Sequence, residues 1–402
     1  MYNDSKLYQK LSVGDEMDAL LFAAMLGDKH IVDFKKMKYK YPDCFDSFLE
    51  TLAAGYYKEL PLSDFAGQPL VYLPSCTGVN LEAVKLLFAS RGGSFGVSCL
   101  EDEIISTSSI ESIDFSRDSV RSIMKGFAPK DEAETRILGL KKGFEFISNK
   151  ANRITEKNIY KLYMMSVGDF LEEENRLPEG SFYRKDSVYV VGTAIEHTGI
   201  DHSKLPARMA ELVKFANHKD DINDLLKAAM LHFYLAFLHP YFDGNGRMAR
   251  LLHMWYLIQK GYESTLFVPL SSYIERSRKK YYDSFTLIEE NYKLSGVIDI
   301  TPFLKYYSEN VYDKISKEEV KPDTLAKYGE LLQSGEITVK EAELWQFVLS
   351  AYAGKSFTTK QLEKDFGNAA FATIRKFVLK FTEKGLLTAT KLSNKVLYAV
   401  KN

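Results

Sequence analysis

The sequence predicts a mainly α-helical protein that contains one β-hairpin within its helical part and a small α+β unit at its C-terminal end. Three observations support this fold class. Apolar residues recur at helical spacing across most of 101–312, a Val- and Tyr-rich stretch at 187–197 interrupts that spacing, and residues 336–402 combine helical with alternating patterns. A chain of 402 residues is also too long for a single small core, so two or three domains are expected.

The composition is that of an ordinary globular protein. Apolar residues make up 46% and charged residues 27%, and a net charge of -1 provides no overall field that attracts nucleic acid or an anionic membrane. The cysteines, Cys44, Cys76 and Cys99, are odd in number and far apart, which argues against a disulfide framework and for a reducing compartment. The apolar stretch at 19–26 is too short to span a bilayer. We therefore expect a cytoplasmic protein with no membrane partner.

Residues 1–100 are expected to form an N-terminal helical region. Loop signals interrupt its periodicity at 41–44, 60–69 and 90–96. Helical spacing then dominates in 131–150 and 154–171. Residues 313–335 are charged and polar, and we expect a helical connector or linker there.

Two stretches in the middle of the chain lead up to a motif. SVYVVGTAIEH, residues 187–197, follows a turn-rich segment and predicts a small β-hairpin among the helices. NDLLKAAMLHFYLAFLHP, residues 223–240, is mostly apolar and predicts a buried helix. Pro240 and the glycines after it end that helix, so it delivers His239 at its C-terminal end.

Residues 336–402 show the element order of a winged helix, three helices followed by a β-hairpin. The middle helix opens at Thr358 or Thr359 and closes at Gly367. Such modules usually contact DNA through the third helix and the hairpin. The basic side chains there are Arg375, Lys376, Lys380, Lys384, Lys391 and Lys395. Because the third helix is also rich in Phe and Val, we favour protein docking or self-association and keep DNA binding as the alternative.

HPYFDGNGRMAR, residues 239–250, concentrates unusual residues in one short segment. Gly244 and Gly246 permit backbone conformations that are closed to other residues, and a helical pattern starts just after them. A glycine loop that leads into a helix N-terminus presents free N–H groups and a partial positive charge. Such a backbone nest suits a diphosphate or triphosphate.

The charged side chains of this segment fit the same anion. Arg247 and Arg250 lie in the first helical turn, where the dipole disfavours cations unless an anion lies between them. Asp243 is placed to hold Mg²⁺, which binds through one or two carboxylates and phosphate oxygens. A histidine side chain, whose ordinary pKa is about 6.5, suits the removal of a proton from an attacking hydroxyl. His239 is therefore the candidate base.

HPYFDGNGRMAR resembles the signature of the Fic family, HPFxDGNGRxxR, with Tyr241 in the place of Phe. The similarity covers roughly residues 100–310. The intact Asp-Gly-Asn-Gly run resembles the adenylyl-transferring members, not the phosphotransferase Doc branch. The resemblance implies a Fic-type helical core with the β-hairpin as a flap. The expected domains are then 1–100, a catalytic domain with an inhibitory helix at 101–312, the linker at 313–335, and a winged helix at 336–402.

The resemblance implies protein AMPylation. AMP passes from ATP, bound with Mg²⁺, to a Ser, Thr or Tyr hydroxyl of an unknown target protein. The implied roles are general base for His239, Mg²⁺ ligand for Asp243, phosphate binding for Asn245 and the backbone of Gly244 and Gly246, and β- and γ-phosphate binding for Arg247 and Arg250. The residues alone do not separate attack on the α-phosphate from attack on the γ-phosphate, the reaction of a kinase.

A second stretch, STSSIESI at 106–113, reads by itself as a helix cap or polar loop. Residues Thr107 to Glu111 resemble the family's inhibitory pattern of Ser or Thr, three residues, and Glu followed by Gly or Asn, whereas Ser112 departs from it. The resemblance implies that Glu111 pairs with Arg250 in the place of the γ-phosphate and keeps the enzyme nearly silent. In relatives the same glutamate can support AMP removal, which stays open here.

Two further stretches resemble known parts of the family. In LSSYIERSRKKYYDSF, residues 270–285, Ser277 stands where asparagine is usual, and Tyr281 and Tyr282 are expected to stack on adenine or else to be core aromatics. The hairpin residues Val188, Tyr189, Val190 and Val191 correspond to the family's flap, whose edge accepts a target segment as an extra strand. The alternative is a hairpin that only covers the site.

Other functions remain as alternatives. In one alternative the chain is a DNA-binding regulator that senses nucleotide. In the other it is a Fic enzyme that uses another donor or removes AMP. A homodimer that covers the inhibitory helix is also open, as are the target and the signal that lifts inhibition.

Overall fold

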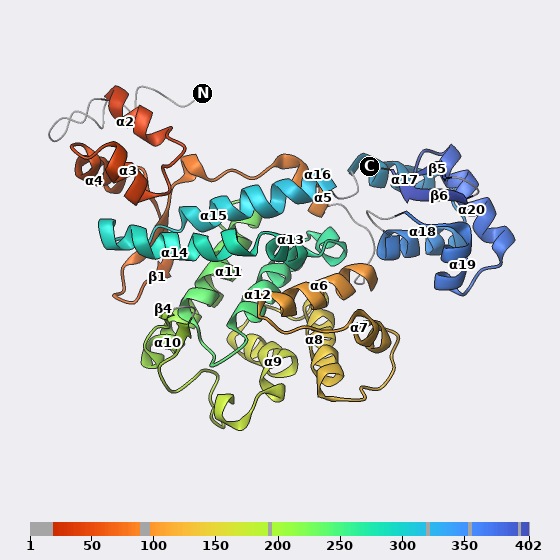
Figure 1. The fold of residues 1–402 in the computed structure, drawn as a ribbon, viewed down its shortest axis with the longest axis horizontal. Helices are drawn as coiled ribbons and strands as arrows, with labels where there is room; N and C mark the ends of the chain where they lie inside the picture. Colours follow the sequence, from red (N-terminus) through yellow and green to blue (C-terminus); the bar gives the residue numbers. More distant parts are fainter. Residues whose placement is uncertain are drawn as a thin grey trace.

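The computed structural model describes residues 19–88, 97–191, 195–318, 322–352, 356–392 and 395–401. The described residues are mainly helical and carry three small antiparallel hairpins, which confirms the predicted fold class (Figure 1). Buried apolar side chains gather in three separate clusters, a small one near the N-terminus, a large central one and one at the C-terminal end. No helix among the described residues is long and apolar enough to cross a membrane.

The N-terminal part has a small core of its own, built around Phe22, Phe34 and Phe48. Its elements are α2 (Ala19–Leu26), α3 (Phe34–Lys40), α4 (Phe45–Gly55), β1 (Lys58–Ser63), β2 (Pro69–Tyr72), η1 (Pro74–Cys76) and α5 (Leu81–Phe88).

The β1–β2 hairpin occupies a stretch that the sequence presents as a loop. Its partners explain the difference, because Val71 in β2 exchanges backbone hydrogen bonds with residues far along the chain. The Val71 N–H donates to the carbonyl of Ile298 at 3.0 Å, and the Ile300 N–H donates to the carbonyl of Val71 at 2.9 Å. A local pattern contains no trace of that pairing.

The central part holds the predicted motif. Its first half comprises α6 (Val97–Ile110), α7 (Arg117–Met124), α8 (Glu132–Ser148), α9 (Glu156–Ser166), η2 (Gly168–Phe170), η3 (Glu173–Asn175), β3 (Tyr189–Val191), β4 (Ile195–Thr198), η4 (His202–Lys204) and α10 (Leu205–Asn217). Its second half comprises α11 (Asp224–Leu238), α12 (Asn245–Gln259), η5 (Glu263–Phe267), α13 (Leu270–Arg276), α14 (Arg278–Ser295), α15 (Thr301–Tyr307), the π-helical turn η6 (Ser308–Tyr312) and α16 (Asp313–Glu318).

Helices α11 and α12 pack against each other at the centre of this part, and nearly all their side chains are buried. The other helices surround this pair (Figure 1). The apolar stretch before His239 therefore forms the predicted core helix, and a rigid pair of helices holds the loop between them, residues 239–244.

The C-terminal part comprises α17 (Pro322–Gln333), α18 (Val339–Tyr352), α19 (Thr359–Phe366), α20 (Phe371–Glu383), β5 (Leu387–Leu392) and β6 (Lys395–Val400). Thr358 caps α19 by accepting a hydrogen bond from the Gln361 N–H at 3.2 Å, and Gly367 ends it with φ 67°, as the sequence predicts. Helix α18 packs against α6, so this part contacts the helix that leads to Glu111 (Figure 1).

Candidate active site

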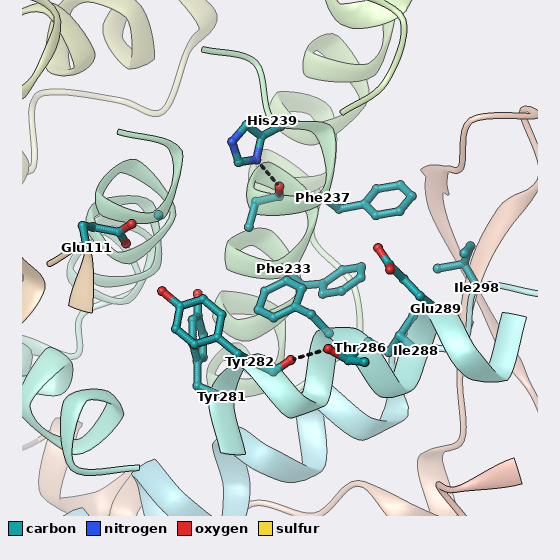
Figure 2. A pocket seen from close by; sticks show the side chains of 13 residues that line it. Glu111, Phe233, Phe237, His239, Tyr281, Tyr282, Thr286, Ile288, Glu289 and Ile298 are labelled. Atoms are coloured by element: carbon teal, nitrogen blue, oxygen red, sulfur yellow. Dashed lines mark hydrogen bonds between the residues drawn. The ribbon is translucent and has the colours of Figure 1, made fainter. Parts of the chain in front are cut away.

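His239 stands at the end of α11 in a left-handed conformation, with φ 54° and ψ 59°. Its ring Nδ1 lies 3.1 Å from the carbonyl oxygen of Ala236 (Figure 2). Because a carbonyl only accepts, Nδ1 carries the proton and donates it to Ala236. In the neutral ring Nε2 is then the unprotonated nitrogen, which is the state that a general base needs.

The side chain of Arg184 holds the backbone of His239 in place. The side chain is 2% exposed, and its Nε donates to the carbonyl of His239 at 2.7 Å. The other guanidinium nitrogens donate to the carbonyls of Asp186 and Ile200, and burial lowers the pKa of Arg184. Through these three bonds Arg184 connects the loop after α11 to the residues that precede and follow the β3–β4 hairpin.

The loop after His239 depends on its glycine and its asparagine. Gly244 has φ 81°, and a Cβ there would lie 2.4 Å from Cγ1 of Val167, so any side chain would be both strained and crowded. The side chain of Asn245 is buried and bonds the backbone N–H and carbonyl of Tyr241, at 3.0 and 2.8 Å. These two bonds close the loop. The ring of Tyr241 stacks on Tyr163 with centroids 3.7 Å apart.

Helix α12 begins directly at this loop. Gly244 is its N-cap and supplies no side-chain hydrogen bond, so the first-turn N–H groups face the site without a side-chain acceptor. The glycine pattern predicts an anion-binding backbone nest at this position.

Both arginines of the motif are buried beside that helix end. Arg247 donates to Oδ2 of Asp243 at 3.2 Å, and the Asp243 side chain is half exposed. Among the described residues, Nε of Arg247 and NH1 of Arg250 are buried without a hydrogen-bond partner. Buried charged donors without an acceptor are costly, so their presence here favours an anionic ligand.

The side chain of Arg250 also contacts the upstream segment that contains Thr107 and Glu111. NH2 of Arg250 donates to Oε1 of Glu111 at 2.7 Å, while Thr107 accepts from Nε through its hydroxyl and from NH2 through its carbonyl, at 2.7 and 2.9 Å. A Cβ at Gly246 would lie 2.2 Å from Oε1 of Glu111. Gly246 therefore leaves room for an acidic oxygen at the start of the helix.

Ser112, which departs from the family pattern, has φ 60°. This left-handed conformation is what Gly and Asn adopt most readily, so the geometry explains why those two residues are usual at this position. Serine retains the turn at a cost of roughly 1–2 kcal/mol. Its hydroxyl accepts a hydrogen bond from NH2 of Arg278 at 3.0 Å, which helps to hold the turn.

A pocket of about 180 Å³ opens beside His239 and Glu111 (Figure 2). Its wall is mostly apolar and aromatic and comes from α11 and α14, and its residues include Phe233, Ala236, Phe237, Tyr281, Tyr282, Phe285, Thr286 and Glu289. Pockets of this kind suit a flat aromatic group.

Tyr281 and Tyr282 differ in their surroundings. Tyr281 is buried, and its hydroxyl lies 2.9 Å from Nε2 of His232, whose Nδ1 lies 2.7 Å from the hydroxyl of Tyr307. Burial keeps the pKa of His232 well below its usual range, so the ring is neutral. Tyr282 is 38% exposed. Tyr281 is thus both a core residue and part of the pocket wall, and Tyr282 belongs to the wall.

Residues 153–257 match the Fic/DOC family. This stretch of the chain is similar to Fic domains. The chain is 28% identical over 184 residues to the protein adenylyltransferase Fic of Aedes aegypti, covering 44% of this chain and 32% of that protein. It is 29% identical over 153 residues to the protein adenylyltransferase Fic of Drosophila yakuba, covering 36% and 28%. The chain therefore spans about a third of the length of these curated relatives.

A solved Fic family protein from Desulfovibrio desulfuricans is also similar, at 17% identity and a TM-score of 0.45, over 76% of this chain and 87% of that one.

The predicted β-hairpin is present. Tyr189 pairs with Thr198 and Val190 with His197, and Val188 accepts a backbone hydrogen bond from Gly199 at 3.0 Å. A Cβ at Gly199 would lie 3.2 Å from the Cβ of His239. The end of the hairpin therefore passes directly against the candidate base.

Sequence reasoning missed two residues that contact the candidate site, Arg184 and His232. Arg184 precedes the hairpin in an ordinary polar stretch, and His232 lies inside an apolar helix. Each acts through backbone or side-chain contacts with residues that are distant in sequence, so neither has a local signal.

Proposed function

We propose that this chain is a protein adenylyltransferase. It transfers AMP from ATP to a hydroxyl group of a target protein. The observation that carries the proposal is the position of His239, whose Nδ1 lies 3.1 Å from the carbonyl oxygen of Ala236, beside a helix N-terminus that also carries two buried arginines. The curated relatives bear the name of this activity.

In the proposed reaction the target hydroxyl gives its proton to Nε2 of His239. Its oxygen forms a bond to the α-phosphorus, the bond from that phosphorus to the bridging α–β oxygen breaks, and pyrophosphate leaves with the electron pair. General bases of this kind contribute roughly 10²- to 10⁴-fold. The N–H groups of α12 and the free nitrogens of Arg247 and Arg250 bind the phosphates.

Asp243 is the residue that would hold Mg²⁺. Its carboxylate is half exposed beside the phosphate nest, and a single carboxylate fits an ion that takes its other ligands from phosphates and water. Among the described residues no group of three or more His, Cys, Asp or Glu side chains surrounds a metal position, which agrees with an ion brought in by the nucleotide. Such an ion would neutralise charge that develops on the phosphates.

We also propose that Glu111 holds the enzyme in an inhibited state. Its carboxylate accepts a hydrogen bond from NH2 of Arg250, the nitrogen that would otherwise bind the γ-phosphate. ATP then binds with its phosphates misaligned, and misalignment slows transfer steeply. The carboxylate is 28% exposed, so it is accessible enough to be displaced.

The hairpin is the proposed docking place for the target. Pairing of a target strand with Val188 to Val191 holds a hydroxyl near His239 through backbone bonds, with little demand on sequence. Val188 and Gly199 form a hydrogen-bonded pair, so in this antiparallel register the N–H of Tyr189 faces the open edge. Tyr189→Pro removes that N–H. We expect it to lower target labelling by more than its effect on ATP affinity, and equal losses would contradict docking here.

The C-terminal part is proposed as a protein-docking module. Lys380 in α20 and Lys384, which follows that helix directly, are paired with Glu341 and Glu336, which leaves fewer cations for DNA. Contact between α18 and α6 offers a route from this module to Glu111. If the chain binds DNA in a retention assay and loses it at higher salt, that result would favour the regulator alternative.

We also propose that the protein is cytoplasmic.

The decisive test uses ATP labelled on different phosphates. We expect the protein to become labelled from [α-³²P]ATP and not from [γ-³²P]ATP. His239→Ala should abolish labelling, and His202→Ala, which changes an exposed histidine, serves as the control. Labelling from the γ-phosphate would indicate a kinase and overturn the proposal.

A further inference from the structure

A second cavity lies apart from the active-site pocket and has the opposite character. It is open to solvent and has a volume of about 520 Å³ between the α13–α14 junction on one side and η6 with α16 on the other. Five of its eight lining residues are cations, Arg276, Arg278, Lys279, Lys280 and Lys314, and none of the eight is acidic.

Several of these cations are not neutralised locally. Lys279 pairs with Asp283 at 2.7 Å. By contrast, Lys280 donates to the amide oxygen of Asn310 at 3.1 Å, and Arg278 donates to the carbonyl of Ser109 and the hydroxyl of Ser112. These acceptors are neutral, so the positive charges around the cavity repel one another across a short distance.

The backbone adds to that repulsion. Arg278, Lys279 and Lys280 form the first turn of the long helix α14, whose N-terminal end carries partial positive charge, and no acidic residue is present in that turn. Cations are disfavoured at this end of a helix. The opposite wall is a π-helical turn, a rare form that is often found at functional sites.

We propose that this cavity binds a small molecule that carries two or more linked phosphoryl groups. A polyphosphate chain can accept from Arg278 and Lys280 on one wall and from Lys314 on the other, so linked phosphoryl groups engage more of these cations than a single phosphate does. The cavity is a hollow between two elements and not a stripe along one face, which favours a compact ligand over a nucleic-acid strand. The volume is within the range of ordinary ligand sites.

The site is connected to the active site through Arg278. The two oxygens that this arginine bonds, on Ser109 and Ser112, flank Glu111, at 3.1 and 3.0 Å from its nitrogens. A polyphosphate that takes over these N–H groups withdraws two hydrogen bonds from the turn that carries Glu111. Occupancy therefore loosens the proposed inhibitory contact, a consequence that rests on the proposed function.

Hydrogen exchange with inorganic tripolyphosphate as the probe tests the site itself. We expect slower amide exchange in peptides that cover 273–280 and 308–316, in the wild type and equally in His239→Ala. The double variant Lys280→Ala/Lys314→Ala changes two exposed side chains and should lose this protection, with affinity at the site reduced at least tenfold. Lys293→Ala, an exposed lysine further along α14, should retain it.

Protection confined to 239–250, or protection that the double variant leaves unchanged, overturns the proposal. A parallel arm with ADP separates the sources of the ligand. Stronger protection by ADP assigns a nucleoside polyphosphate, and stronger protection by tripolyphosphate assigns an inorganic one. Because exchange needs no catalysis, its outcome is independent of whether AMP transfer occurs. At saturating ATP, a several-fold rise in labelling on adding tripolyphosphate, lost in the double variant, supports the link to Glu111, and no rise refutes that link.

Discussion

Replacing Glu111 with glycine tests the contact between the two halves of the site. The carboxylate forms a charge-assisted hydrogen bond of 2.7 Å to Arg250, which is 2% exposed on its side chain, while Glu111 is 28% exposed. Bonds of this kind contribute about 1.5–3 kcal/mol. At 1.4 kcal/mol for each factor of ten, freeing Arg250 should raise the rate of AMP transfer roughly 10- to 100-fold. The partial exposure of Glu111 places the expected gain below the upper limit.

The assay is incorporation of label from [α-³²P]ATP into the protein at saturating ATP. Glu111→Gln, which keeps an acceptor oxygen but removes the charge, should give an intermediate rate. Asp114→Gly makes the same kind of change three residues away on an exposed acid and should leave the rate unaltered. If Glu111→Gly binds ATP normally and its labelling does not rise, the proposed inhibitory role of the pair is wrong.

Three other changes probe the support of the site. Arg184→Gln removes the guanidinium from the carbonyl of His239, and we expect kcat to fall by at least tenfold with KM for ATP nearly constant; a change in KM alone would argue against positioning. Gly244→Ala combines φ 81° with a Cβ 2.4 Å from Val167, so thermal unfolding should show a loss of about 2–4 kcal/mol, and an unchanged Tm would contradict the crowding. Burial raises the pKa of Glu103 to about 7, well above its unfolded value of 4.5. The unfolded state therefore releases this proton first, and the cost to stability is absent below pH 4.5 and grows as pH rises towards 7. Urea unfolding should show that Glu103→Gln removes this part of the pH dependence, and parallel curves for the two proteins would refute it.

The helical core and the loop chemistry were predictable because their signals are local. The apolar spacing of residues 223–240 is sufficient to bury α11, and the helix must then end where Pro240 follows His239. Likewise Gly244 and Gly246 mark a loop that enters a helix, whatever packs around it. Such features depend on backbone sterics and on neighbours within a few residues.

The partners of that loop were decided by the tertiary structure. Glu111 and Arg250 are separated by 139 positions, and without the family resemblance the segment around Glu111 reads as a polar cap. The left-handed turn at Ser112 and the support of His239 by Arg184 left no pattern in the sequence. The β1–β2 hairpin, which pairs with residues near 298, was predicted as a loop.

The sequence by itself determined which residues form the glycine turn at the start of α12, since backbone freedom and helix polarity are properties of a few consecutive residues. Only the tertiary structure decided what faces that turn, because burial and the pairing of distant charges depend on how the helices pack. The cationic cavity follows the same division. Its arginines and lysines are visible in the sequence, but their convergence around one hollow exists only once α14, η6 and α16 are in place.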